Sequence, residues 1–588
     1  MKSHRLNYHS EKSTLRDYFW ALKGIRMPWL FLLLIFASSL GSTFAALNIS
    51  FFTGDMVDAQ GNVPTAKLMK YALSYGGIGV AAAGITVFSA LASERINLGL
   101  RTKLWRKIMY TQQSCYDRDG GNSLVSRVTA DCDFASKLLT TIATTLSLCI
   151  SLGIYAKRMY KLNVTIAAAM LILIPVSVLV GWGYAKLRFL IAQRSQAMLA
   201  RTTTYLVERT RSIPLIKTAN AQSEEIRNGQ GHFREQYHMQ LKTGIMDVVY
   251  SCMQTAFRIL GIFIPFVIGA KLVSEGVIRV GVVVVFYNLT GTVSTAATNF
   301  IDNVGTIRRA NGALTRVITT LKQPDEDTQE GRSMDDPDQD ITFRGVRFGY
   351  NADKLVLKNV DCVIPKHQVT AIVGANGSGK STMFKLLDRL YEPSEGKLLF
   401  GHIPANEYDV HAWRKTFCLV AQGSPLMEGT VRENICYGCQ RPISQEELIK
   451  VAKQARVYDF VSALPDGFDT RVAPGGTNFS GGQRQCIAIA RAMMNNPDYL
   501  LLDEATSNLD AHSERMVMEA LDELMSGRTT VIIAHSLSAI RKADHVIILR
   551  DGMVESSGAP AQVLQATGNY LEKVMQRRSS FAGCEEVK

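Results

Sequence analysis

Residues 374–381, with the sequence G-A-N-G-S-G-K-S, fit the pattern G-x-x-x-x-G-K-[ST]. The apolar run 370–373 precedes them and a helix-compatible run follows, as expected where a loop joins a strand to a helix. Glycines let the backbone wrap an anion, and successive amides and the helix N-terminus point toward it. We expect Lys380 to reach the outer phosphates of a nucleotide and the Ser381 hydroxyl to hold Mg²⁺. The predicted nucleotide-binding residues are Gly374, Asn376, Gly377, Ser378, Gly379, Lys380, Ser381 and Thr382.

A second chemical candidate is the apolar run 499–502, which ends in the adjacent carboxylates Asp503 and Glu504. Side chains alternate sides along a strand, so these two carboxylates point differently and can hold different roles. A nucleotide-hydrolysing site built on a phosphate loop needs one carboxylate near the metal and another group that orients the attacking water. One of these two carboxylates therefore suits Mg²⁺, and the other suits the attacking water.

The elements that must position these residues are short strands alternating with helices. From residue 341 onward, apolar runs such as 369–373 and 499–502 alternate with helical segments, which is typical of a sheet flanked by helices. We predict an α/β nucleotide-binding domain over 341–575 and a polar tail over 576–588. The acidic, Pro-containing stretch 323–340 is predicted to be a linker.

The first half of the chain has a different composition. The chain has 588 residues, too many for one core at roughly 150 residues per domain, and hydrophobic residues make up 47% of it, which argues against disorder. Long charge-free runs of about 20 residues, enough to cross a bilayer, lie in the first half. We predict an all-α transmembrane domain over 1–322, with six spans near 28–54, 71–93, 138–156, 162–185, 248–270 and 280–301.

The distribution of basic residues predicts the orientation of these spans. The formal net charge is +13, and Lys and Arg concentrate in the N-terminal segment and in 94–137 and 186–247. With six spans these three segments share one side, which is expected to be the cytoplasm. The short basic turn predicted at 157–161 then falls outside, against this tendency. We expect a multi-pass protein of the inner (cytoplasmic) membrane, with its N-terminus and nucleotide domain in the cytoplasm.

The ten cysteines are scattered through segments predicted to be membrane or cytoplasmic, so we expect no disulfide framework. Cys436 and Cys439 have C-x-x-C spacing, but no second Cys or His pair accompanies them as a zinc site needs. We interpret that spacing as coincidental. Arg258 interrupts the fifth predicted span and is expected to face the bundle interior or a water-filled cavity.

Residues 479–483, F-S-G-G-Q, resemble the signature motif of ATP-binding cassette (ABC) transporters, whose usual first residue is Leu. The resemblance implies that Tyr350 stacks on adenine, that Gln422 helps to hold Mg²⁺ and that His535 contacts the terminal phosphate. With it we expect Glu504 to orient or deprotonate the attacking water, and Asp503 to hold Mg²⁺ through a water. It also implies that the signature of one chain covers the ATP held by Lys380 of a second chain. The remaining ATP-binding residues that it implies are Ser480, Gly481, Gly482, Gln483 and Asp510.

The membrane half agrees with this resemblance. Residues 116–131 resemble the first intracellular loop of exporter-type members, and Glu208 with 213–217 resembles the second. The resemblance implies a six-helix transmembrane domain fused ahead of one α/β nucleotide-binding domain. It implies ATP-driven transport by alternating access, with export favoured, in a dimer of half-transporters. The expected partners are the lipid bilayer, an unidentified transported substrate and a second chain, with a homodimer favoured because Glu504, His535 and the signature are all retained; no nucleic acid is expected.

Two other classes of protein fit part of this pattern. An exporter-shaped importer of a metal chelate, such as a siderophore, would share every motif. A soluble ABC ATPase acting on nucleic acid or ribosomes would hydrolyse ATP and tolerate the net charge of +13, but it has no use for six apolar spans. An ATP-gated channel is a third and weaker alternative.

Overall fold

The computed structural model describes residues 15–59, 64–326, 331–351, 354–421, 423, 425–503, 510–534 and 537–567. The chain divides into two compact units. One contains Met1–Met109 and Gly120–Gln323, and the other contains Tyr110–Asp119 and Pro324–Lys588. The short helix α4 (Gln113–Asp119) therefore belongs to the second unit, although its neighbours in sequence belong to the first.

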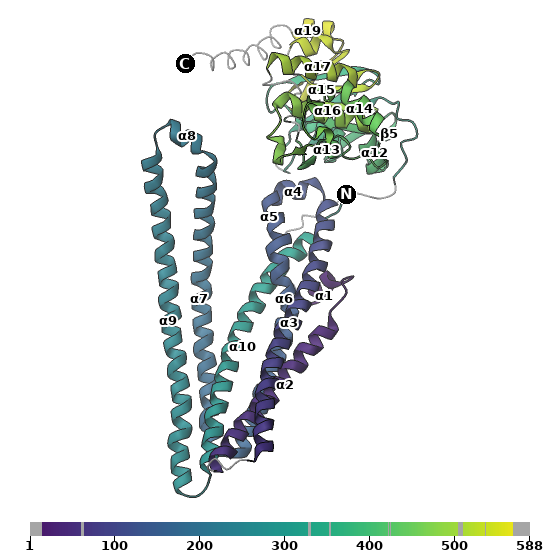
Figure 1. Cartoon of the computed structure of the whole chain (residues 1–588). Helices are drawn as coiled ribbons and strands as arrows, with labels where there is room; N and C mark the ends of the chain where they lie inside the picture. The colour runs from purple at the N-terminus through teal and green to yellow at the C-terminus, as the bar shows by residue number, and fades with distance from the viewer. Residues whose placement is uncertain are drawn as a thin grey trace. The chain divides into compact units, whose positions relative to one another are not determined.

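The first unit is helical. Its helices are α1 (Leu15–Leu22), α2 (Trp29–Asp58), α3 (Thr65–Met109), α5 (Gly121–Ser126), a π-helical turn (Arg127–Asp131), α6 (Cys132–Leu162), α7 (Val164–Arg211), α8 (Ile213–Thr218), α9 (Gln222–Ser274) and α10 (Val280–Leu321). Helices α2, α3, α6 and α10 pack together, while α7 and α9 form a long hairpin that carries α8 at its tip (Figure 1).

Five helices among the described residues are long and apolar enough to cross a membrane: Trp29–Asp58, Thr65–Met109, Gly121–Leu162, Gln222–Ser274 and Val280–Leu321. The predicted span 162–185 lies almost entirely within α7, part of whose side chains fall outside the described set. The count of six spans therefore stays a prediction.

The predicted turn at 157–161 is wrong. These residues are helical, and α6 continues to Leu162. The chain turns instead at Asn163, whose side-chain oxygen accepts hydrogen bonds from the backbone N–H groups of Thr165 (3.0 Å) and Ile166 (3.1 Å). Asn is a favoured helix N-cap, whereas Lys, Arg and Met are good helix formers, so local preference places the break after the basic residues.

Helices α2 and α10 approach each other closely near Gly54 and Gly281. A Cβ atom added to Gly281 would lie 2.2 Å from the Gly54 carbonyl oxygen, so only glycine fits there. Asp58, the last residue of α2, accepts a hydrogen bond of 2.7 Å from the Gly281 N–H group. That bond satisfies one of the unpaired donors at the start of α10.

The second unit is built on a ten-stranded mixed sheet in the order β5-β4-β1-β2-β12-β11-β3-β10-β9-β6. Strands β11, β3, β10, β9 and β6 are mutually parallel, and β1, β2, β4 and β5 pair antiparallel. The strands are β1 (Ile341–Phe348), β2 (Leu357–Ile364), β3 (Val369–Gly374), β4 (Glu395–Phe400), β5 (Ile403–Pro404), β6 (Phe417–Val420), β9 (Tyr499–Asp503), β10 (Thr529–Ile533), β11 (His545–Arg550) and β12 (Met553–Gly558). A small second sheet pairs β7 (Gly429–Thr430) with β8 (Arg471–Val472).

Nine further helices of this unit lie among the described residues after Pro324: α11 (Lys380–Leu387), α12 (Val410–Thr416), α13 (Val431–Ile435), α14 (Gln445–Gln454), α15 (Tyr458–Ser462), α16 (Gly481–Asn495), α17 (Ala511–Met525), α18 (Leu537–Lys542) and α19 (Pro560–Thr567). A helical unit followed by an α/β unit with a mixed sheet confirms the predicted fold class.

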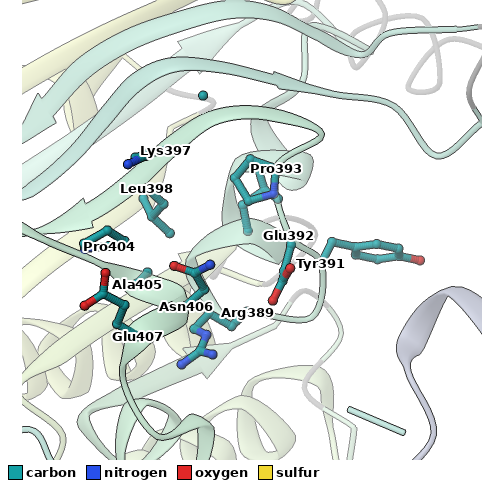
Figure 2. Close-up of a pocket in the computed structure, with 12 residues that line it drawn as sticks. Arg389, Tyr391, Glu392, Pro393, Lys397, Leu398, Pro404, Ala405, Asn406 and Glu407 are labelled. Atoms are coloured by element: carbon teal, nitrogen blue, oxygen red, sulfur yellow. The ribbon is translucent and has the colours of Figure 1, made fainter. Parts of the chain in front are cut away.

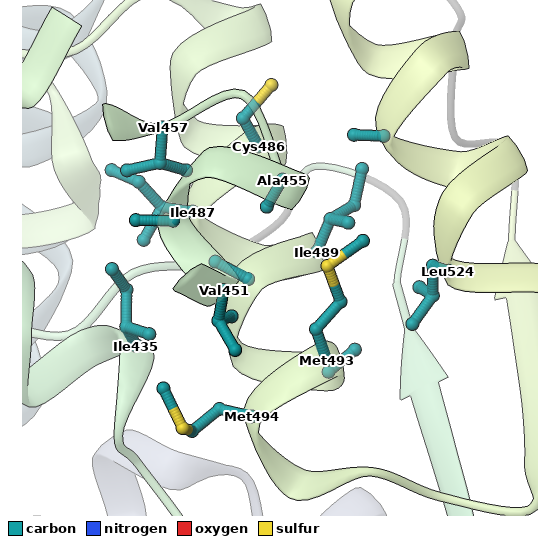
Figure 3. Close-up of a cluster of buried hydrophobic side chains, with 14 of the residues drawn as sticks. Ile435, Val451, Ala455, Val457, Cys486, Ile487, Ile489, Met493, Met494 and Leu524 are labelled. Carbon is teal, nitrogen blue, oxygen red and sulfur yellow. The ribbon is translucent and has the colours of Figure 1, made fainter. Parts of the chain in front are cut away.

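Two of the hydrophobic clusters of this unit hold the helices that matter for the predicted site. In the first, Ile435, Val451, Ile487 and Leu524 bring α13, α14, α16 and α17 into one core (Figure 3). The second lies against the sheet, where the rings of Trp413, Phe417 and Tyr499 stack at centroid distances of 4.6 and 4.8 Å. These cores fix α11 and α16, the two helices whose N-termini carry the predicted nucleotide-binding sequences.

Candidate nucleotide site

Four neighbouring parallel strands, β3, β10, β9 and β6, end at one edge of the sheet. Ile533 of β10 lies opposite both Ile372 of β3 and Asp503 of β9, and Val420 of β6 lies opposite Leu502. Gly374 is the last residue of β3 and Asp503 is the last residue of β9. The two residues therefore lie at the same edge of the sheet, with only β10 between their strands. In open α/β sheets, ligands bind outside the carboxyl ends of the strands.

Three predicted residues follow these strand ends in sequence. Gln422 comes two residues after β6, Glu504 directly follows β9, and His535 comes two residues after β10. All three lie outside the described residues, so their roles stay predictions.

The loop between β3 and α11 has a backbone that requires glycine. Gly377 and Gly379 have φ angles of +81° and +107°, which side-chain-bearing residues rarely adopt. A Cβ atom on Gly379 would lie 2.5 Å from Leu357 Cδ2, and one on Gly374 would lie 2.3 Å from the Leu549 carbonyl oxygen. Asn376 is exposed at the turn of the loop. The loop thus exposes backbone at a helix start, where amide groups attract anions.

Lys380 and Ser378 supply polar groups inside this loop. Lys380 is 6% exposed, and its Nζ atom donates hydrogen bonds to the carbonyl oxygens of Gly374 (2.8 Å) and Ala375 (3.0 Å). The Oγ atom of Ser378 is buried and has no hydrogen-bond partner among the described residues. A buried hydroxyl without a partner is costly, and an oxygen-rich ligand would satisfy it. The loop therefore fits a phosphate group.

The donors available for a cation are oxygen atoms. Ser381 is exposed on the first turn of α11, and Asp503 is partly exposed at the end of β9. Among the described residues, no group of three or more His, Cys, Asp or Glu side chains converges on a metal position. Mg²⁺ prefers a few protein oxygens together with substrate phosphates and water, so this sparse donor set fits it.

Tyr350 is positioned beside α11 by Thr382 and by two other aromatic rings. Its hydroxyl lies 3.2 Å from Thr382 Oγ1, and the residue is 43% exposed. The ring meets Phe348 edge to face at 5.2 Å and Tyr391 at 5.3 Å. Lys385 Nζ lies 4.9 Å from the ring centroid. An exposed, fixed ring next to a phosphate loop is able to stack on a planar base.

The predicted signature residues open helix α16. Ser480 is its N-cap, and its hydroxyl accepts a hydrogen bond from the Gln483 N–H group (3.2 Å), while Gln483 Oε1 accepts one from the Ser480 N–H group (2.9 Å). This reciprocal capping box leaves Ser480 and Gly481 exposed to solvent. A Cβ atom on Gly482 would lie 2.5 Å from Ser513 Cβ, so the start of α16 packs directly on α17.

Asp510 is the N-cap residue of helix α17. Its carboxylate accepts hydrogen bonds from the N–H groups of His512 (3.1 Å) and Ser513 (3.0 Å). Hydrogen bonds from Ser513 hold the pKa of Asp510 below its ordinary value. Ser513 thus links the signature turn to Asp510, a connection that the sequence pattern did not reveal.

Helix α4 packs against the nucleotide-binding part of its unit. The Tyr391 hydroxyl donates a hydrogen bond to the Asp117 carboxylate. The backbone N–H group of Glu326 donates to the Tyr110 carbonyl oxygen (2.8 Å), and Arg414 holds the Glu326 carboxylate through two hydrogen bonds of 2.8 and 2.9 Å. Residues 324–326 are therefore paired with residues 110–112.

Two cavities flank the segment that carries Tyr391. One of about 240 Å³ is lined by residues of both α4 and the sheet domain, including Gln112, Ser114 and Arg389. The other, of about 300 Å³, includes Arg389 and Glu407, and the Tyr391 ring points away from it (Figure 2). Burial and the bond to Asp117 raise the pKa of Tyr391, so its hydroxyl stays a donor. No sequence motif marks Tyr391 or Lys385, and it is their packing on Tyr350 that identifies them.

Comparison with known families shows which family the chain belongs to. A family model described as ABC transporter matches residues 357–507, and one described as ABC transporter transmembrane region matches residues 30–297. The chain belongs to the ABC transporter family. As an ABC transporter with both parts in one chain, it binds and hydrolyses ATP and spans a membrane.

Similar ABC transporters cover nearly the whole chain. A multidrug resistance ABC transporter ATP-binding and permease protein of Lactococcus lactis is 28% identical over 576 residues, covering 96% of each chain. An ATP-dependent lipid A-core flippase of Alcanivorax borkumensis is 29% identical over 486 residues, covering 82% of this chain and 83% of the flippase. The ABC multidrug transporter MDR5 of Trichophyton rubrum is 41% identical over 246 residues, 42% of this chain and 19% of its own. This ABC transporter is therefore of the exporter type.

Proposed function

We propose that this ABC transporter works as a homodimer that exports a lipid or drug-like amphiphile across the cytoplasmic membrane. The exposure of Ser480 and Gly481 at the start of α16 carries the dimer proposal. These groups offer a hydroxyl and an amide at a helix N-terminus, and both residues are exposed among the described residues of their own unit. In the proposed dimer they cover the ATP that Lys380 of the second chain holds.

The proposed hydrolytic site uses residues of both described and undescribed segments. Glu504 orients or deprotonates the attacking water, and His535 contacts the terminal phosphate. Ser381, Gln422 and, through water, Asp503 hold Mg²⁺, which when bound neutralises phosphate charge. Tyr350 stacks on adenine, and the loop 374–382 wraps the phosphates. The oxygen donors and the glycine-dependent loop described above support this arrangement.

Helix α4 supports a mechanical connection between nucleotide and membrane parts. It packs within the second unit, but α3 and α5, to which it is covalently joined, belong to the first. A displacement of the nucleotide-binding part thus pulls directly on two helices. Helix α8 presents exposed Ile213 and Leu215 at the tip of the α7–α9 hairpin, and we propose that the partner's nucleotide domain covers them. ATP drives alternating access only because it binds the closed dimer more tightly.

The substrate class and direction rest on the relatives. Their names describe multidrug resistance and lipid A-core flipping. We propose the same class for this chain, with the N-terminus and nucleotide domain in the cytoplasm.

Mixed dimers test whether the site is shared between chains. Lys380→Ala removes the phosphate-binding amine, and Ser480→Arg blocks the exposed signature; each variant alone is expected to lose ATPase activity. Two affinity tags select dimers that contain one chain of each kind. If each site combines Lys380 of one chain with Ser480 of the other, the mixed dimer keeps one intact site and regains activity.

Mixed dimers as inactive as both parents would overturn the shared site. The unmodified chain, purified alone in nanodiscs, is expected to hydrolyse ATP; inactivity without another chain would contradict a homodimer. Transport into inside-out vesicles, with no uptake by right-side-out cells, tests export against import of a metal chelate.

A further inference from the structure

Cys436 and Cys439 flank a tight turn that follows helix α13. The Cys439 N–H group donates a hydrogen bond of 3.1 Å to the Cys436 carbonyl oxygen, which closes a four-residue turn. Gly438 has a φ angle of +92°, as the third residue of a type II turn requires. Such a turn holds its end Cα atoms within about 7 Å, and disulfides span Cα distances of about 4.4–6.8 Å. The backbone is thus already suited to a disulfide.

The two thiols are free and partly accessible. Both side chains are half-buried. Burial raises the pKa of Cys436, and the charge of a neighbouring Cys439 thiolate raises that pKa further. The Sγ atom of Cys439 lies 3.5 Å from Asn495 Oδ1 and 3.8 Å from the Met494 carbonyl oxygen. In a disulfide this sulfur would carry no hydrogen to donate to either acceptor.

The turn is connected to the segment that follows Gln422. Asn495 at the end of α16 donates a hydrogen bond of 3.1 Å to the Tyr437 carbonyl oxygen. One turn earlier, Arg491 donates to the carbonyl oxygen and side-chain oxygen of Asn434 (2.8 and 3.0 Å). Asn434 in turn donates to the carbonyl oxygens of Met427 (2.8 Å) and Thr430 (3.0 Å). A change at the turn therefore reaches both the loop after Gln422 and the helix that carries the signature.

We propose that Cys436 and Cys439 are a reversible redox site, which forms an intramolecular disulfide on reaction with a low-molecular-weight disulfide such as glutathione disulfide. One thiolate attacks the oxidant to give a mixed disulfide and one reduced thiol. The second thiolate then displaces the other half of the oxidant. The pair loses two protons and two electrons, and the oxidant becomes two thiols.

A metal site explains the turn less well than a disulfide. Zinc takes four ligands from Cys, His or carboxylate groups. Among the described residues no third such group joins Cys436 and Cys439. Two thiols at the ends of a turn suffice for a disulfide.

Peptide mapping tests the covalent step on the full-length protein. Trypsin does not cut before Pro442, so the peptide 433–450 carries these two cysteines and no other. After treatment with glutathione disulfide and alkylation, we expect this peptide to be lighter by two hydrogens and to carry no alkyl group. Two alkylated thiols, or a glutathione adduct on each, would overturn the proposal.

ATPase measurements test the consequence. Oxidation is expected to lower the ATPase rate by about two- to tenfold, the effect of losing one hydrogen bond on a rate, and dithiothreitol should restore it. Cys436→Ser and Cys439→Ser should abolish this response, whereas Cys149→Ser, which removes an exposed cysteine of α6, should keep it. An equal response in Cys436→Ser would assign the effect to another thiol. The untreated Cys436→Ser protein should hydrolyse ATP at the normal rate. A missing response to oxidation would therefore contradict the redox site without contradicting the proposed transport function.

Discussion

The ring of Tyr391 meets the ring of Tyr350 edge to face at a centroid distance of 5.3 Å and an angle of 89°. The hydroxyl of Tyr391 also donates a hydrogen bond to Asp117 in α4. One side chain thus contacts both the residue proposed to stack on adenine and the helix joined to the membrane part. Lys385 lies over both rings, at 4.9 and 5.7 Å, and holds the pair in place.

Tyr391→Phe and Asp117→Ala are expected to lower the melting temperature of the full chain by similar amounts. Each removes one partner of a single hydrogen bond to a charged group, which at this exposed position is worth about 1 kcal/mol. The double variant should therefore lose no more stability than either single variant. Thermal unfolding in detergent of the unmodified protein, the two single variants and the double variant measures these losses. Tyr160→Phe, at an exposed tyrosine of α6, is the control; additive losses would show that Tyr391 and Asp117 act separately.

Glu504→Gln should retain ATP binding and slow ATP turnover by about 10²- to 10⁴-fold, the usual effect of losing a general base. The amide keeps the size of the side chain and removes its basicity. Nucleotide binding to the purified variant and steady-state phosphate release measure the two parts separately. An unchanged rate of phosphate release would remove Glu504 from the mechanism.

Gly482→Ala is expected to destabilise the protein by about 1–3 kcal/mol and to lower ATPase activity, because overpacking forces α16 away from α17. The added methyl group would lie 2.5 Å from Ser513 Cβ. Ser513→Gly in the same chain removes that obstacle and should recover part of the loss. Gly291→Ala, in open space on α10, is the control and should change neither quantity. No recovery in the double variant would mean that the contact with Ser513 is not the cause.

Asp388, at the end of α11, makes stability depend on pH. Burial raises its pKa to about 6, and nearby Arg414 opposes this shift only partly. The folded protein therefore holds this proton up to about pH 6, whereas the unfolded chain releases it near pH 4. The contribution of Asp388 to stability is favourable below pH 4 and is lost as the pH rises through 4 to 6.

Asp388→Asn keeps the size of the side chain and removes its charge. Its melting temperature relative to the unmodified protein should therefore be higher at pH 7.5 than at pH 4.5. A difference that does not change with pH would contradict the assignment. Asp361→Asn, at an exposed aspartate on β2, is the matched control.

Local sequence patterns predicted those features that depend on neighbours along the chain. The glycines and Lys380 of the phosphate loop follow a buried strand and open a helix, and that order alone indicates a nucleotide site. The predicted α/β class followed from the alternation of short apolar runs with helical segments. The motif at 479–483 indicated the family before its capping geometry was known.

Features that depend on distant contacts could not be predicted in this way. Nothing in residues 110–119 indicates that they pack with residues 324–326, since their pairing is made by backbone groups that every residue carries. The basic residues 157–161 suggested a turn because charge is rare in membrane helices, yet the stronger capping residue was Asn163. No local pattern marks Tyr391, because its contacts with Tyr350 and Asp117 are made only in the folded chain.

The assignment of 110–119 to the second unit has a practical consequence for dissecting the protein. A soluble fragment that began at residue 324 would lack the carbonyl oxygen of Tyr110 that pairs with Glu326, and the carboxylate of Asp117 that accepts from Tyr391. Such a truncated piece would have an altered surface beside Tyr350. Kinetic constants measured on it would describe a different molecule from the intact transporter.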